Sequence, residues 1–98
     1  MNSQDILDRL RENESLLRAR GVTHAALFGS RARGDNRADS DIDIMIEIAP
    51  EIVQDVYDYV GLKSFIAALF TDRVDVVDRR ALKPYVRPLA EGDAVYAF

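Results

Sequence analysis

The chain has 98 residues, 48% of them hydrophobic, which predicts a single domain over residues 1–98 with a modest core. It contains no Cys, which excludes disulfides and thiolate zinc sites and fits a reducing, cytoplasmic setting. A net charge of −4 disfavours long nucleic acid as a stable direct partner, and no apolar run approaches the ~20 residues of a membrane span.

The first third of the chain predicts a helix, a strand and a short helix. Ser3 can cap the first helix, and Gly21 ends it. The apolar side of this helix is formed by Ile6, Leu7, Leu10 and Leu17. Residues 22–28 are then expected to form a strand, and residues 30–33 a short helix that stops at Gly34.

Residues 41–48 form the clearest strand pattern in the sequence, after a polar loop over residues 35–40. One face of this strand carries only isoleucine, at Ile42, Ile44, Ile46 and Ile48. The other face carries Asp41, Asp43, Met45 and Glu47. We therefore expect the isoleucine face to pack on the core and to hold the two aspartates rigidly on the opposite side.

The second half predicts a long helix, a strand, a short helix and a last strand. The long helix is expected over residues 52–70, with a possible interruption at Gly61. Its apolar stripe would be Val53, Val56, Tyr57 and Val60. The expected later elements are a strand over 73–77, a short helix opened by Pro84 but limited by Pro88, and a strand over 94–98 after Gly92-Asp93. Interspersed helices and strands predict an α/β (α+β) fold, with helices packed on a small sheet.

The residues that carry chemistry are Gly29-Ser30, followed after ten residues by Asp41-Ile42-Asp43. Alternate residues of a strand project from one face with Cα atoms ~6.6 Å apart, so both carboxylates can reach a hard cation between them. A P-loop would need Gly-Lys-Ser/Thr, and an EF-hand loop would need Gly at Ile44 and Glu at Pro50. Both alternatives fail.

Gly29 and Ser30 lie at the expected junction between a strand and a helix. A glycine there lets the backbone approach a ligand closely, and free amides at a helix start attract phosphate oxygens. The Ser30 hydroxyl could donate to a phosphate, and Arg31 and Arg33 could add charge-assisted hydrogen bonds. The two arginines could equally be exposed residues of a short helix.

The segments 28–34 and 40–47 together resemble the polymerase-β-like nucleotidyltransferases, whose signature is Gly-Ser, a spacer and Asp-x-Asp. They look most like the minimal nucleotidyltransferase (MNT) antitoxins that are encoded beside HEPN-domain ribonuclease toxins. The resemblance implies a nucleotidyltransferase fold and a third carboxylate within a Val-Asp-hydrophobic context on a later strand. Asp75 matches that context, whereas Asp72 and Asp78 lie at the edges of the same strand.

The resemblance also implies ATP as substrate, two Mg²⁺ ions and in-line transfer of AMP to a tyrosine of a HEPN toxin. Asp41 and Asp43 would ligate both ions. Asp75 would complete the site of one of them or accept the proton of the attacking hydroxyl. Two alternatives remain open: an antitoxin that neutralises its toxin by binding alone, and nucleotidyl transfer to a small molecule or an RNA end.

Overall fold

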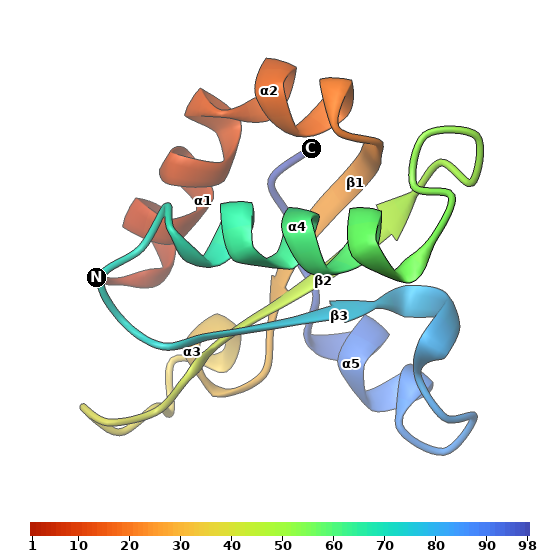
Figure 1. Ribbon diagram of the computed structural model, residues 1–98. Coiled ribbons are helices and arrows are strands. Elements are labelled where there is room, and N and C mark those ends of the chain that lie inside the picture. The colour runs from red at the N-terminus through yellow and green to blue at the C-terminus, as the bar shows by residue number, and fades with distance from the viewer.

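The computed structural model describes residues 1–98 and is built on a four-stranded mixed sheet, ordered β3-β2-β1-β4 (Figure 1). The strands are β1 Val22–Phe28, β2 Ile42–Ile48, β3 Val74–Asp78 and β4 Val95–Tyr96. β1 pairs antiparallel with β2 and β4, and β2 pairs parallel with β3. The predicted small mixed sheet is therefore confirmed.

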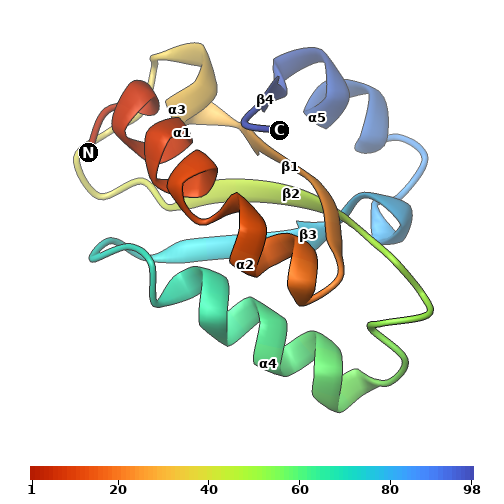
Figure 2. The ribbon, with the colours of Figure 1, turned by 90° about the horizontal axis from the view of Figure 1, so that it is seen from above.

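The helices lie on both sides of this sheet. They are α1 Ser3–Glu12, α2 Glu14–Ala19, α3 Ser30–Arg33, α4 Val56–Ala67 and α5 Arg87–Asp93, with a 3-10 turn η1 Arg79–Ala81. Figures 1 and 2 show α1, α2 and α4 on one side of the sheet and α5 on the other. The main core lies between the isoleucine face of β2 and the side chains of α1, α2 and α4. The burial of Ile42, Ile44 and Ile46 confirms the predicted alternation.

The first helical region differs from the prediction in its start and in its continuity. Asn2, not Ser3, is the N-cap, because its side chain accepts from the Asp5 amide while the Asp5 carboxylate accepts from the Asn2 amide. The helix then breaks at Asn13, whose side-chain amide donates to the Arg9 carbonyl. The predicted apolar residues are nonetheless buried, because both short helices pack on β1.

The α4 helix is shorter than predicted and turns a different face to the core. It begins after Asp55, whose carboxylate caps it by accepting from the Asp58 amide, and it runs through Gly61 without interruption. Leu62 and Ile66 are its buried residues. The predicted stripe is wrong: Val56, Tyr57 and Val60 are exposed, and only Val53, which precedes the helix, packs against the core. The prediction counted Val53 as part of the helix, but the residues before Asp55 are not helical and do not determine which face of α4 is buried.

The C-terminal region also departs from the prediction. The last helix begins at Arg87, with Pro88 in its first turn, where a missing amide hydrogen is tolerated. Gly92 and Asp93 are the last residues of this helix, and the strand after it is only two residues long. Ala90 of α5 packs against Met45 on the second face of the sheet. No helix has both the length and the apolar character that crossing a membrane requires.

Candidate active site

The three predicted aspartates lie at one end of the β2–β3 pair. β2 and β3 run parallel, with Asp43 directly opposite Asp75. The side chains of Ile42 and Val76 are buried in the main core, on the face that α1, α2 and α4 cover. Asp43 and Asp75 therefore project from the opposite face. Asp41 lies immediately before β2 and is partly exposed. The structure thus brings together carboxylates from two strands, β2 and β3, that are separated by α4 in the sequence.

The Gly29-Ser30 corner lies against Asp43, because Phe28 pairs with Asp43 across the β1–β2 ladder. Gly29 adopts φ 75° and ψ −155°, a backbone region that is essentially confined to glycine. A Cβ atom at Gly29 would overlap the Asp43 carboxylate. Ser30 then opens α3, and Gly34 ends that helix in the left-handed conformation. Glycine at position 29 therefore permits close contact with the Asp43 side chain, whereas the predicted approach of this backbone to a ligand stays a prediction.

Asp43 carries the electrostatic signature of this site. Partial burial, and then the charges of Asp75 and Asp41, raise the pKa of its carboxyl above the ordinary value of 3.8, while Arg33 and Arg31 oppose the shift. A raised pKa means that the negative charge on Asp43 is disfavoured in the metal-free protein. A positive ion beside it would relieve this repulsion.

The donor set fits a magnesium ion that binds together with a nucleotide. All three side chains offer carboxylate oxygens, which are the ligands that Mg²⁺ prefers. No three acidic, His or Cys side chains are grouped closely enough to enclose an ion by themselves. Protein sites for Mg²⁺ commonly use one or two carboxylates and take further oxygens from substrate phosphates. The only ion pair on these aspartates is a loose one, 3.7 Å between Asp41 Oδ1 and Nε of Arg73, a side chain that is 90% exposed.

The sequence allowed Arg31 to be either an exposed helix residue or a phosphate ligand. In the structure its side chain is buried, and its guanidinium is engaged by other parts of the chain. Its side chain is 5% exposed, and the guanidinium donates to the carbonyls of Met1 and Ser40 and pairs with Asp72. Its charge still acts on Asp43, as the opposing pKa contribution shows. The predicted contact of Arg31 with phosphate stays a prediction.

Arg33 is exposed, as a phosphate ligand would need to be, but its guanidinium is paired with two aspartates. Its Nη1 lies 2.6 Å from Asp93 Oδ2, at the end of α5, and its Nε lies 3.1 Å from Asp35 Oδ2. Both pairs are at the surface, where an ion pair contributes little to stability. Arg33 would have to leave these partners to contact a phosphate, and the predicted contact stays a prediction.

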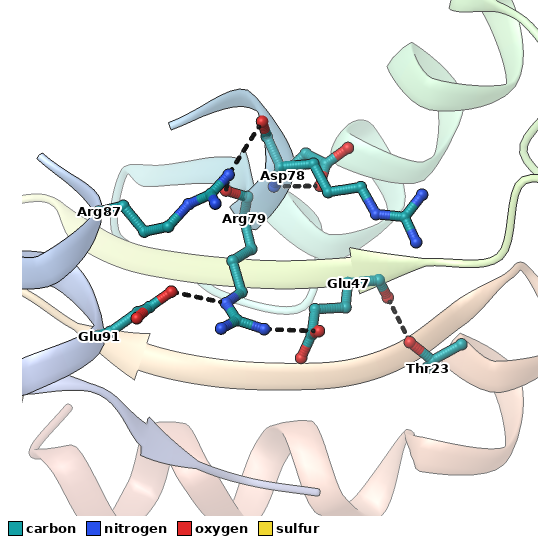
Figure 3. Close-up of polar contacts among 7 residues, drawn as sticks. Thr23, Glu47, Asp78, Arg79, Arg87 and Glu91 are labelled. Carbon is teal, nitrogen blue, oxygen red and sulfur yellow. Dashed lines mark hydrogen bonds and ion pairs between the residues drawn. The ribbon is translucent and has the colours of Figure 1, made fainter. Parts of the chain in front are cut away.

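The far end of the carboxylate face is closed by α5 and a polar network (Figure 3). Arg79 bridges Glu47 of β2, at 3.1 Å, and Glu91 of α5, at 2.9 Å. Arg87 donates to the backbone carbonyl of Arg79, and the Thr23 hydroxyl donates to that of Glu47. Glu47 is thus held by Arg79, which also binds Glu91 of α5, and it is not part of the group of aspartates.

Sequence reasoning considered Asp72 only as a poorer third carboxylate and did not single out Arg73, although both residues lie beside the site. Asp72 pairs with Arg31, and the Arg73 carbonyl accepts from the Ile42 amide at 2.8 Å. A signal was present, because residues that precede two adjacent parallel strands lie side by side. Parallel pairing of β2 and β3 therefore implies that the segment before β3 lies beside the segment before β2.

Comparison with known proteins agrees with this geometry. Residues 5–95 match the family described as polymerase beta, nucleotidyltransferase. Protein adenylyltransferase MntA of Thermococcus cleftensis is 32% identical over 95 residues, an alignment that covers 89% of this chain and 94% of the relative.

Two solved structures share the fold over most of the chain. A structure described as a candidate minimal nucleotidyltransferase superposes with a TM-score of 0.78 at 30% identity, covering 97% of this chain and 95% of the other. A chain from a complex of tri-AMPylated Shewanella oneidensis HEPN toxin with MNT antitoxin gives a TM-score of 0.62 at 25% identity, covering 91% and 70% respectively. With the matched family, these similarities establish that the chain belongs to the polymerase-β-type nucleotidyltransferases, in the group of the MntA protein adenylyltransferases.

Proposed function

We propose that this nucleotidyltransferase transfers AMP from ATP to a tyrosine hydroxyl of a HEPN-domain protein and so acts as the antitoxin of a toxin–antitoxin pair. The observation that carries the proposal is the paired Asp43 and Asp75 beside the Gly29-Ser30 corner. The donor and the acceptor class follow from the relatives: one is named a protein adenylyltransferase, and one structural neighbour comes from a complex with an AMPylated HEPN toxin.

The aspartates would hold two Mg²⁺ ions together with phosphate oxygens of the nucleotide. When bound, the ions would neutralise charge on the phosphates and favour ionisation of the acceptor hydroxyl. Asp43 on β2 and Asp41, immediately before that strand, are two residues apart and are suited to share ions, and Asp75 completes the set from the neighbouring strand. Asp75 is also the group that can take the hydroxyl proton.

The transfer itself is a substitution at phosphorus. The tyrosine oxygen forms a bond to the α-phosphorus while the bond from that phosphorus to the bridging oxygen breaks, and pyrophosphate leaves. Gly29 lets the phosphates approach the backbone, and the Ser30 hydroxyl donates to them. Arg33 would move from Asp93 and Asp35 to the leaving pyrophosphate. Arg31 would act only through its positive charge, from its buried position near Asp43. Positioning and charge neutralisation are the main sources of rate in this class of reaction.

The proposal is tested with the purified chain and the protein encoded beside it, incubated with ATP and Mg²⁺ and weighed by mass spectrometry. We expect an AMP-sized mass increase on a tyrosine of the neighbour, lost in Asp43→Asn and in Asp75→Asn. Asp39→Asn is the matched control, because this aspartate is exposed in the adjacent loop and lies outside the signature. No increase with wild type, or an undiminished increase with Asp43→Asn, would refute the proposal.

Neutralisation by binding alone is distinguished in cells that express the toxin. The double variant Asp41→Asn/Asp43→Asn should fail to protect such cells while still copurifying with the toxin. Full protection by this variant would show that binding suffices and that transfer is not the means of neutralisation.

A further inference from the structure

We propose that Arg31 is a positioning residue that fixes the backbone around Asp41 and thereby sets how tightly the site binds its divalent cation. This inference rests on the metal-dependent transfer proposed above. It concerns a buried side chain that contacts three segments of the chain which are remote in sequence.

The contacts of Arg31 join α3 to the N-terminus, to the loop before β2 and to the segment before β3. Its Nη2 donates to the Ser40 carbonyl at 2.7 Å. Its Nη1 lies 3.2 Å from the Met1 carbonyl and 3.2 Å from Asp72 Oδ2. The planar guanidinium offers several donors in a fixed arrangement, so one side chain can set the relative positions of these segments.

The peptide groups on both sides of Asp41 are held by this arrangement. On the N-terminal side, the Ser40 carbonyl accepts from Arg31. On the C-terminal side, the Ile42 amide donates to the Arg73 carbonyl at 2.8 Å, next to Asp72, which Arg31 also holds. The other hydrogen bonds of residues 36–40 stay within that loop. Arg31 therefore supplies the hydrogen bond that links residues 36–40 to the rest of the protein.

The buried guanidinium of Arg31 is expected to contribute little to the folding stability of the protein. Its Nε is buried without a hydrogen-bond partner, and removing a guanidinium from water costs much of what its ion pair returns. The effect of this residue should therefore appear in the placement of the metal ligand. Partners that orient a metal ligand typically change metal affinity or activity by about 10–100-fold.

The test compares Arg31→Met and Arg31→Lys with Arg80→Met, which removes the same charge from an exposed side chain that forms no ion pair. Two measurements are made: amide hydrogen exchange of Ile42 in the metal-free chain, and Mn²⁺ affinity from water proton relaxation in the presence of a non-hydrolysable ATP analogue. We expect Arg31→Met to speed Ile42 exchange and to weaken Mn²⁺ binding about 10–100-fold. Arg31→Lys keeps the positive charge but lacks the planar set of guanidinium donors, so it should restore only part of the Mn²⁺ affinity.

Unchanged Ile42 exchange and Mn²⁺ affinity in Arg31→Met would overturn the proposal. A higher KM for ATP at saturating metal, with Mn²⁺ affinity unchanged, would instead assign Arg31 to direct phosphate contact and would also overturn it. If Arg31→Met does not fold, Asp72→Asn tests the same link from its partly exposed partner and should weaken Mn²⁺ binding by up to about tenfold. Failure of wild type to transfer AMP would refute the proposed function but leave both measurements decisive for Arg31.

Discussion

Replacing Asp43 with Asn should stabilise the metal-free protein at neutral pH while abolishing transfer. The Asp43 carboxylate is partly buried, lies opposite Asp75 and has a raised pKa, with no hydrogen bond among the causes that act on it. An amide of nearly the same shape removes the charge without removing a structural contact. The site thus holds a charge arrangement that favours cation binding at the expense of stability.

The magnitude follows from the pairing across the strands. Cross-strand charge pairs change stability by roughly 0.2–1 kcal/mol, and like charges directly opposite destabilise. For a chain of this length, such a gain raises the melting temperature by about 1–6 °C.

The sign of the pH dependence follows from the raised pKa. Well above the folded-state pKa of Asp43 the wild type carries the full cost of its charge, so the advantage of Asp43→Asn is largest there. As the pH falls through that pKa, the folded state takes up a proton before the unfolded state does, and the wild type gains relative stability. Below 3.8 the carboxyl is protonated in both states, and the difference between the proteins should vanish.

The assay is thermal unfolding followed by circular dichroism, with a chelator present, from neutral pH to below the ordinary pKa of aspartate. Asp39→Asn, an exposed residue of the preceding loop, controls for the loss of one negative charge. A melting temperature of Asp43→Asn at or below that of wild type near neutrality would refute the repulsion argument. So would an advantage that persists unchanged in acid.

Two further predictions test the glycine corner and the orientation of α4. Gly29→Ala should cost about 1–3 kcal/mol in urea unfolding and abolish AMP transfer, because its positive φ and the overlap with Asp43 both oppose a Cβ atom. Gly34→Ala has a positive φ but open space around it, so it should lose stability and keep transfer; similar transfer losses in both variants would contradict the steric argument. Leu62→Ala should lower the free energy of unfolding by about 2–5 kcal/mol, whereas Val60→Ala on the exposed face should change it by less than about 0.5 kcal/mol. The reverse order in urea denaturation would contradict the observed face of α4.

Much of the site could be predicted because its signals are local. Alternation over residues 41–48 predicted the face of Asp43, and Asp41 lies just before that strand. The glycine before Ser30 marked a backbone position without room for a Cβ atom, where Gly29 lies against Asp43. The outward position of Asp75 followed from its two valine neighbours. Periodicity of two is unambiguous in such short segments, and the neighbouring strands did not alter it.

The orientation of α4 and the role of Arg31 could not be derived in the same way. Apolar residues occur on every side of α4, at Val56, Tyr57, Tyr59, Val60, Leu62, Phe65 and Ile66, so periodicity alone does not select the buried face. The packing of Leu62 and Ile66 on the sheet selects it. Arg31 finds its partners at residues 1, 40 and 72, and no local pattern connects those positions.

The parallel alignment of β2 and β3 makes the active site a product of the complete fold. The two strands are joined through α4, so their alignment depends on how that helix docks rather than on a tight turn. A slip of β3 by one residue would turn Asp75 into the hydrophobic interior and bring a valine to the face that carries Asp43. Contacts between segments so distant along the chain are slow to form. A newly made chain should therefore gain transfer activity only after β2, α4 and β3 have docked together.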